Sequence, residues 1–275
     1  MAITAKDVMA LRHRTGVGMM DCKKALTQAD GDTEKAVEIL REKLKGKMDE
    51  RSDRPAGEGV LALAKSDSAI AFIELKAETD FTARNDDFVA VAQKIADLAL
   101  AGPAGEVTEV SAAVTELIDN LRITTKENIS FARGIKLVGS KVGGYVHFDR
   151  KSGAVVNGEG DLADELLSGI SMHITASVPT PKGVDQDSLP ASEVEAARQA
   201  AIDDAKASGK PQEIAEKIAT GKLRKWVDEN SLMGQIYLRE MDAKKPIREF
   251  MPKDSKITSF VRYQVGETGG KAVDQ

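Results

Sequence analysis

GVLALAKSDSAIAFIELKA, residues 59–77, is the stretch that decides the fold class of this 275-residue chain. Its apolar residues recur with a period close to two in the runs Val60 to Leu63 and Ile70 to Leu75, which flank the polar turn Lys65 to Ser68. Strand-like runs on either side of a short polar turn predict a β-hairpin. A sheet therefore begins here.

Downstream of this hairpin the periodicity becomes helical and then strand-like again. Helices are predicted at about 86–100 and about 107–121, and a strand at 129–138. Helices between a hairpin and a closing strand are typical of an α+β unit, in which the helices cover the sheet. The first core subdomain is therefore predicted to span residues 59–140.

The same order of elements recurs farther along the chain. A second hairpin is predicted at 145–156 and a helix at about 162–177. The closing strand contains Ser-Phe-Val-Arg at 259–262, which echoes Ser-Phe-Ala-Arg at 130–133. We therefore predict a two-fold repeated α+β core, built from small antiparallel sheets with helices.

The second core subdomain, residues 141–267, is longer than the first. The excess falls in a stretch rich in Ala, Glu, Lys and Gln, 191–229, which Ser-Gly-Lys-Pro at 208–211 divides into two helices. Helices joined by so short a turn lie antiparallel. An antiparallel helical hairpin is therefore predicted as an insertion at about 186–228.

The residues before the first hairpin predict a bundle of three short helices. Thr4 and Asp7 form a capping box for the first helix, and Gly16 provides its stop. Asp21 and Asp32 are suitable N-caps for the second and third helices. The remaining parts of the predicted domain organisation are the three-helix N-terminal domain, 1–45, a linker, 46–58, and a flexible tail, 268–275.

Composition disfavours several classes of function. A net charge of −5 and an aromatic content of only 4% argue against phosphate attraction and base stacking, so no nucleic-acid partner is expected. No apolar stretch approaches the roughly 18 residues that span a bilayer, so no membrane association is expected. The single cysteine, Cys22, shares an apolar helical face with Leu26 and is expected to be structural. With one cysteine and no secretory pattern at the N-terminus, a cytoplasmic protein is predicted.

The sequence contains none of the common catalytic or metal-binding motifs. It has no phosphate-binding glycine-rich loop, no H-E-x-x-H, no G-x-S-x-G, and no Cys and His cluster at metal spacing. His13, His147 and His173 are far apart in the sequence, so nothing pairs them as a catalytic unit. We therefore predict no enzyme, no catalytic residue, no metal site and no cofactor for the chain itself.

The segment ETDFTARN, residues 78–85, is the most unusual one, because it places a large aromatic residue in a polar strand-to-helix turn. Two interpretations stay open from the residues alone. In the first, Phe81 folds back into the core while Asp80 caps a helix. In the second, Phe81 is an exposed anchor beside a carboxylate, on a loop held by rigid strands, as a binding hot spot requires.

Two motifs make the chain resemble elongation factor Ts over about its full length. LRHRTGVGMMDCKKAL, residues 11–26, is similar to the N-terminal signature of that family, and ETDF, residues 78–81, to its second motif. The resemblance implies an N-terminal three-helix bundle like a ubiquitin-associated domain. It also implies a guanine-nucleotide exchange factor that drives GDP out of elongation factor Tu in translation elongation. Magnesium and GDP or GTP would then be bound by the partner.

The resemblance also implies roles for individual residues. The Thr79-Asp80-Phe81 turn would insert into the GTP-binding domain of elongation factor Tu near its magnesium site. Arg12, Met19 and Met20 would grip that domain, and His147 aligns with a further partner contact. From the residues alone, the methionines could equally fill gaps in the bundle, and His147 could be a surface residue on an edge strand.

Other partner contacts stay open at the level of the sequence. After Val265 the chain has only a short Gly-rich segment, whereas longer members of the family continue into a C-terminal helix that adds partner contacts. A homodimer through the second core subdomain is also left open by the sequence. The competing interpretation is a non-enzymatic adaptor that captures partners through residues 1–45 and uses the core only as a scaffold.

Overall fold

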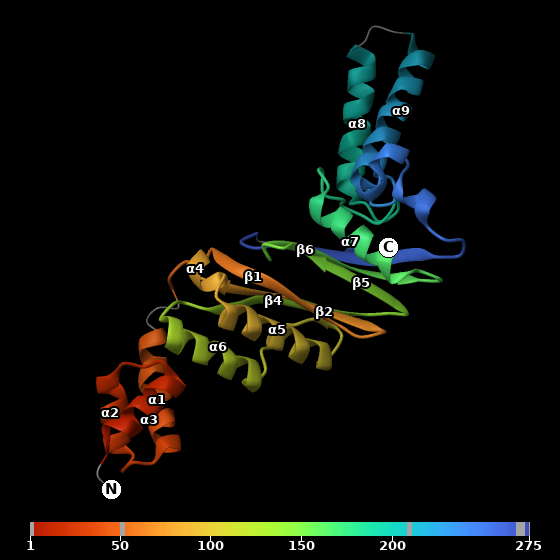
Figure 1. Cartoon of the computed structure of the whole chain (residues 1–275). Helices are drawn as coiled ribbons and strands as arrows, with labels where there is room; N and C mark the ends of the chain where they lie inside the picture. The colour runs from red at the N-terminus through yellow and green to blue at the C-terminus, as the bar shows by residue number, and fades with distance from the viewer. Residues whose placement is uncertain (1–2, 50–52, 208–210, 268–272, 275) are drawn as a thin grey trace. The chain divides into compact units, whose positions relative to one another are not determined.

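The computed structural model describes residues 3–49, 53–207, 211–267 and 273–274. It combines helices with two four-stranded sheets, which confirms the predicted α+β class (Figure 1). The chain divides into two units. Unit 1 comprises residues 1–62 and 72–135, and unit 2 comprises residues 63–71 and 136–275.

Unit 1 begins with three helices, which are α1 (Ala5–Thr15), α2 (Met19–Gln28) and α3 (Thr33–Asp49). The predicted capping box is present, because Asp7 N–H donates to Thr4 Oγ1 and Thr4 N–H donates to Asp7 Oδ2. Gly16 ends α1 with a φ of 65°, a left-handed conformation that glycine adopts without a steric cost. Asp32 Oδ1 accepts hydrogen bonds from the first turn of α3, as expected of its cap.

Helix α2 differs from the prediction in its first residue. Gly18 occupies the N-cap, and Asp21, which was predicted there, lies inside the first turn. A carboxylate in the first turn interacts favourably with the helix dipole, so Asp21 stabilises the same helix end from a different position. Helix α3 continues to Asp49 and so extends into the segment predicted as a linker, of which residues 50–52 lie outside the described residues.

The first sheet has the strand order β1-β2-β4-β3. Its strands are β1 (Glu58–Lys65), β2 (Ala69–Ala77), β3 (Gly105–Glu106) and β4 (Ser130–Val138). Strands β1 and β2 form the predicted hairpin. Helices α5 (Asp86–Ala101) and α6 (Ala112–Thr125) lie along one face of this sheet (Figure 1), and the short α4 (Asp80–Ala83) connects β2 to α5.

Helix α6 begins at Ala112 and not near residue 107 as predicted. Val107 N–H donates to the carbonyl oxygen of Gly134 at 2.9 Å, so this residue still pairs with β4. Ser111 then caps the helix, because its Oγ accepts a hydrogen bond from Val114 N–H at 3.3 Å. The first residues of the predicted helix are therefore held by the sheet, which no local periodicity indicates.

The second sheet has the strand order β5-β6-β7-β8, with antiparallel neighbours. Its strands are β5 (Lys141–Val146), β6 (Ser152–Glu159), β7 (Lys256–Gln264) and β8 (Val273–Asp274). Helix α7 (Asp164–Ala176) packs on β5 and β6, and its Leu167 and Ile170 join Val156 and Phe260 in the core of unit 2. Strand β8 lies in the predicted tail, of which residues 268–272 and 275 lie outside the described residues.

Strand β5 starts at Lys141, earlier than the predicted residue 145, because two glycines conceal the strand pattern. The packing of α7 requires one of these glycines, Gly143. A Cβ added to Gly143 would lie 2.4 Å from Leu167 Cβ. Helix α7 can approach β5 this closely only where the strand carries no side chain.

The two sheets share one feature of their topology. In each, the closing strand, β4 or β7, lies beside the second strand of the hairpin that precedes it. The two matching phenylalanines on these strands differ, since Phe260 is buried and Phe131 is only half-buried. The internal repeat itself stays a prediction.

The helical hairpin is formed by α8 (Ala191–Ala207) and α9 (Gln212–Asn230), which lie side by side (Figure 1). Ala201 and Ala205 are buried, as expected where two helices approach closely, and the predicted turn residues 208–210 lie outside the described residues. At the base, Leu232 N–H donates to the carbonyl oxygen of Gly183 at 2.8 Å, so the chain closes below the hairpin. Two short 3-10 helices, η1 (Leu238–Ala243) and η2 (Ile247–Phe250), follow it.

Candidate functional site

The α4 turn, residues 78–83, and the start of α5 directly after it are each formed by a helix cap. Thr79 has extended backbone angles, and its Oγ1 accepts a hydrogen bond from Thr82 N–H at 3.3 Å, which starts the four-residue helix α4. Asn85 Oδ1 then accepts from Asp87 N–H at 2.8 Å and starts α5. Each cap satisfies a backbone N–H that a helix start leaves without a partner. The first interpretation of this turn, in which Asp80 caps a helix, is wrong on that point, because Thr79 caps α4.

Phe81 is 85% exposed, so the interpretation that it folds back into the core is wrong. Helix α4 turns Ala83, which is only 1% exposed, toward the core. Two residues along an α-helix correspond to about 200° of rotation, so Phe81 must point away from the side that Ala83 buries. The small side chain of Ala83 is therefore packed in the core, and the aromatic ring of Phe81 lies in solvent.

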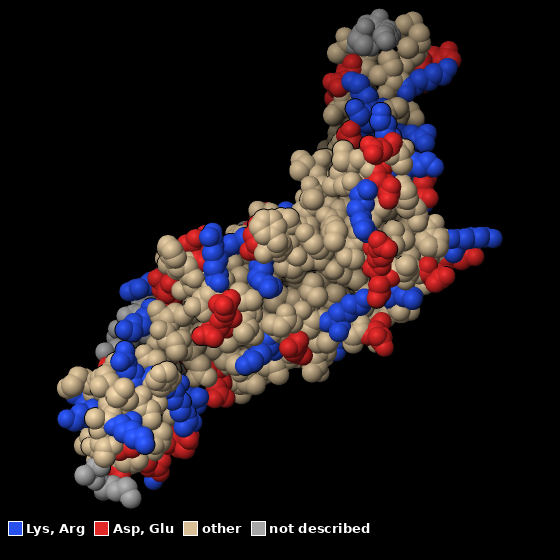
Figure 2. Space-filling model, viewed as in Figure 1, with Lys and Arg blue, Asp and Glu red and all other residues tan. Residues whose placement is uncertain are grey.

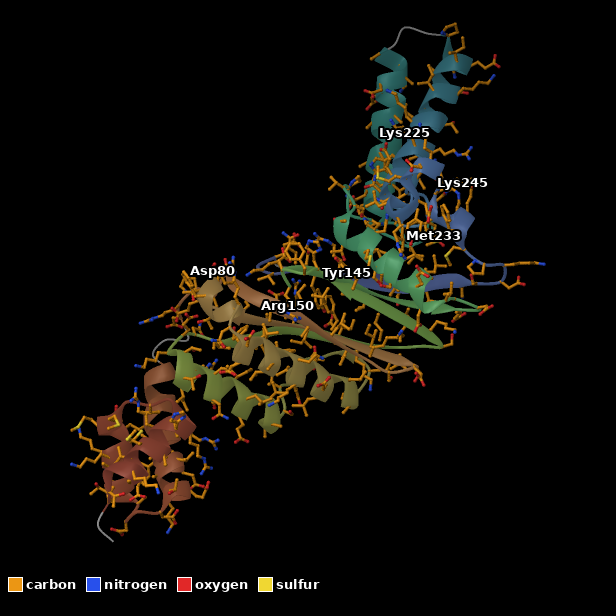
Figure 3. The ribbon with its side chains drawn as sticks, in the orientation of Figure 1. Asp80, Tyr145, Arg150, Lys225, Met233 and Lys245 are labelled. Carbon is orange, nitrogen blue, oxygen red and sulfur yellow. The ribbon has the colours of Figure 1, made fainter. Side chains whose placement is uncertain are left out.

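Asp80, which is labelled in Figure 3, directly precedes Phe81 on α4 and adds a carboxylate to the same turn. Its Oδ2 lies 3.3 Å from Arg84 Nη2, and both side chains are substantially exposed. Exposed ion pairs of this kind contribute about 0 to 1 kcal/mol, so a partner can separate them at little cost. The α4 turn therefore presents an aromatic ring and an available negative charge together.

Glu127 is the residue of this site that sequence reasoning missed. It follows the C-cap of α6, and its carboxylate accepts hydrogen bonds from the backbone and side chains of the α4 turn. It lies 48 residues from Thr79 in the sequence, and no local pattern connects the two.

The N-terminal bundle carries the other predicted contact residues of unit 1. Met19 and Met20 are 42% and 67% exposed, so the interpretation that they fill gaps in the bundle is wrong. Arg12 is also exposed, as is Met9, which lies three residues before it on α1 and was not predicted. Exposed methionines are adaptable apolar surface, which suits contact with another protein.

His147, the remaining predicted contact, lies in unit 2 directly after the edge strand β5. The turn is closed by His147 N–H donating to Ser152 O at 2.9 Å and by Arg150 N–H donating to His147 O at 2.8 Å. The Tyr145 hydroxyl lies 2.8 Å from His147 Nδ1, which orients the imidazole ring. Tyr145 and Arg150, which both hydrogen-bond to His147 here, are labelled in Figure 3.

Phe148, next to His147, was also missed. It is 87% exposed, and its ring centroid lies 4.5 Å from that of His147. The signal that singled out Phe81, an aromatic residue in a polar turn, applies equally to Phe148. The end of the β5–β6 hairpin therefore presents two adjacent rings.

The three histidines have separate surroundings. His173 is buried, its Nε2 lies 2.7 Å from Gln235 Oε1, and burial lowers its pKa. His13 is exposed on α1. Within the described residues, no group of three or more His, Cys, Asp or Glu side chains is arranged to hold a metal ion.

Lys and Arg side chains are interspersed with Asp and Glu on the face shown in Figure 2. Phosphate backbones are bound by extended basic surfaces. The expectation of no nucleic-acid partner stays a prediction. In the described parts of the chain, every helix is too short or too polar to cross a membrane.

Comparison with known proteins covers nearly the whole chain. A family model described as Elongation factor TS matches residues 78–267. Elongation factor Ts of Photobacterium profundum is 39% identical over 98% of this chain and 94% of the relative. Elongation factor Ts of Shewanella loihica is 38% identical over 97% and 92%, and that of a Nitratiruptor species is 33% identical over 97% and 94%. The relatives thus extend the match to the bundle, which precedes the region of the family model.

Proposed function

Because the chain belongs to the elongation factor Ts family, whose members are guanine-nucleotide exchange factors of translation elongation, we propose that it binds elongation factor Tu·GDP and drives GDP out with its α4 turn. The exposure of Phe81 is the observation that supports this proposal most directly. The chain acts as an exchange factor and not as an enzyme in the usual sense, since no bond is made or broken.

Exchange follows from differential binding. GDP is held in its host by magnesium and by backbone N–H groups around the phosphates. A factor that binds the nucleotide-free host more tightly must weaken GDP binding by the same free energy, because the coupling is reciprocal. Magnesium, GDP and GTP belong to elongation factor Tu in this proposal, and the chain itself needs no cofactor.

Phe81 and Asp80 supply the contacts that distinguish the two states of the host. The Phe81 ring inserts near the magnesium site and displaces side chains that support it, while Asp80 brings negative charge close to the phosphates. Anchors of this kind contribute about 2 kcal/mol or more. Both side chains are in place before binding, because α4 already exposes the ring and the Asp80–Arg84 pair is weak.

The remaining predicted residues bind the partner without acting on the nucleotide. Arg12, Met19 and Met20 are each exposed on α1 or α2 and grip the GTP-binding domain of elongation factor Tu. His147 makes a further contact from unit 2. A homodimer through the second core subdomain also stays a proposal, which sedimentation of the free protein tests.

Release of a fluorescent GDP from elongation factor Tu in a stopped-flow instrument tests the proposed function. The full chain should accelerate release, and Phe81→Ala should slow exchange about thirtyfold at subsaturating factor, which corresponds to about 2 kcal/mol. Leu98→Ala, which truncates a partly exposed apolar residue on α5, is the matched control and should exchange like the wild type.

Two results would contradict the proposal. An adaptor that works through the bundle would bind elongation factor Tu and leave the rate of GDP release unchanged. A Phe81→Ala variant as fast as the wild type would instead show that exchange does not depend on the α4 turn.

A further inference from the structure

We infer that Glu127 is a positioning residue for exchange, because its carboxylate holds the α4 turn in the conformation that presents Phe81 and Asp80. This inference rests on the proposed function. It assigns a role to a residue outside both sequence motifs, on the segment between α6 and β4.

The Glu127 carboxylate accepts four hydrogen bonds from the α4 turn. Oε2 accepts from the backbone N–H groups of Glu78 and Thr79, both at 3.2 Å. Oε1 accepts from the side-chain hydroxyls of Thr79 and Thr82, both at 2.7 Å. An ionised carboxylate has about four lone-pair sites, so these donors use its full capacity.

The four donors lie on both sides of the residues that they position. Glu78 and Thr79 precede Asp80 and Phe81, and Thr82 follows them. The Thr79 hydroxyl donates a hydrogen bond to Glu127, which orients its oxygen to accept the hydrogen bond from Thr82 N–H that begins α4. The carboxylate thus supports the N-cap of this helix and also holds Thr82 inside it.

A helix as short as α4 requires such support. It has four residues, whereas isolated helices shorter than about 12 to 15 residues are marginal in water. Hydrogen bonds to an ionised acceptor are roughly twice as strong as neutral ones. The conformation that exposes Phe81 therefore depends on Glu127 more than on the intrinsic preferences of the turn.

Glu127 is itself held in a defined position. Lys126 ends α6 with a φ of 63°, and Glu127 N–H donates to Thr125 Oγ1 at 3.3 Å. The next residue, Asn128, donates its N–H to Glu78 Oε1 at 2.6 Å. Glu78 and Glu127 therefore join the two segments reciprocally, since each carboxylate accepts from the other segment's backbone.

Glu127→Ala in the full chain tests the inference. If loss of the four hydrogen bonds leaves the exposing conformation populated about one-tenth of the time, apparent affinity for the nucleotide-free partner falls about tenfold. The rate of GDP release at subsaturating factor should fall to the same extent. Glu109→Ala, which removes an exposed carboxylate elsewhere in unit 1, is the matched control and should exchange like the wild type.

A double-mutant cycle separates positioning from a merely structural role. If Glu127 acts through Phe81 and Asp80, Glu127→Ala should slow exchange in the wild-type background and cause a clearly smaller loss in the Phe81→Ala background, where only the contribution of Asp80 remains to be lost. Glu127→Gln should stay within about threefold of wild type, because its amide oxygen can serve the backbone N–H groups while its amide nitrogen donates to the rotatable threonine hydroxyls. General destabilisation would produce neither pattern.

A Glu127→Ala variant with wild-type exchange, or one whose loss persists in full without Phe81, would overturn the inference. Should Glu127→Ala fail to fold, Thr82→Val removes one of the four donors and must slow exchange by the same route, or the inference is wrong. Failure of the wild-type chain to accelerate GDP release would contradict the proposed function instead, so the two failures are distinguishable.

Discussion

Phe81 and Phe88 lie seven residues apart in one unit, yet Phe81 is almost wholly in solvent and Phe88 is fully buried. The first is carried by the short helix α4 and the second by the first turns of α5. Because the two side chains are chemically identical, truncating each of them separates a contribution to binding from a contribution to packing.

Phe81→Ala should leave the urea midpoint of unfolding nearly unchanged, whereas Phe88→Ala should lose about 3 to 5 kcal/mol of stability. The difference arises because only Phe88 leaves a cavity when it is truncated. Equilibrium unfolding followed by circular dichroism measures both values. A comparable fall in midpoint for the two variants would show that the Phe81 ring packs in the core in solution.

Cys22→Ala should retain exchange activity and lose about 1 kcal/mol of stability. Cys22 is fully buried in the bundle, and its Sγ–H donates to the carbonyl oxygen of Val17 at 3.4 Å. The thiol therefore packs and has no surface to offer a partner. A Cys22→Ala variant that folds with wild-type stability but exchanges GDP slowly would reveal a functional thiol.

Deletion of residues 186–228 should give a folded protein that still exchanges nucleotide. The pairing of Gly183 with Leu232 closes the chain below the helical hairpin, so both ends of the deletion remain in place. Within the described residues, the deletion removes ion pairs to retained residues that are at least partly exposed and contribute about 1 kcal/mol or less each, namely Asp228–Arg248, Glu193–Lys182 and Lys225–Glu229. Circular dichroism and GDP release measure the outcome; a folded but inert deletion protein would place the hairpin on the active surface.

Stability should fall as the pH drops below 6.5, with His173 as one cause. Burial lowers the pKa of His173 below its ordinary value of 6.5. Leu238 N–H donates to its Nδ1 at 3.3 Å, which only an imidazole unprotonated at that nitrogen accepts. As the pH falls through 6.5, the unfolded chain binds a proton that the folded chain does not, so this contribution is complete above 6.5 and is lost below it.

Replacement of His173 tests whether its titration lowers the stability of the folded protein at acidic pH. His173→Gln should flatten the fall in urea midpoint between about pH 7 and about pH 5, since the linked proton is gone. A steeper fall in the variant would mean that His173 is stabilised in its protonated form in the folded protein.

Phe148→Ala should weaken binding of elongation factor Tu·GDP without changing the maximal rate of GDP release. Phe148 lies on the hairpin that carries His147, and in the proposed function this hairpin binds the partner without displacing the nucleotide. Loss of a contact made equally in all states of the host raises KM and leaves kcat unchanged. The dependence of release rate on factor concentration separates the two parameters, and a lowered maximal rate would assign the hairpin a direct part in displacement.

Elements defined by near neighbours were predictable from the residues. The capping box of Thr4 and Asp7 and the stop at Gly16 follow from contacts within one helical turn. The start of α6 and the start of β5 were not predictable. Val107 is held by Gly134 and Gly143 is packed by Leu167, and partners so distant in the sequence leave no periodic signal.

The candidate site divides in the same way. The motif from Thr79 to Phe81 and its aromatic residue in a polar turn were visible in the sequence, because residue type and spacing are local properties. The exposure of Phe81 was not visible in the sequence, since it depends on which side of α4 is buried by the rest of the unit. That side carries Ala83. The hydrogen bonds from the turn to Glu127 exist only in the folded chain, where the pairing of β2 with β4 brings together residues that lie 48 apart in the sequence.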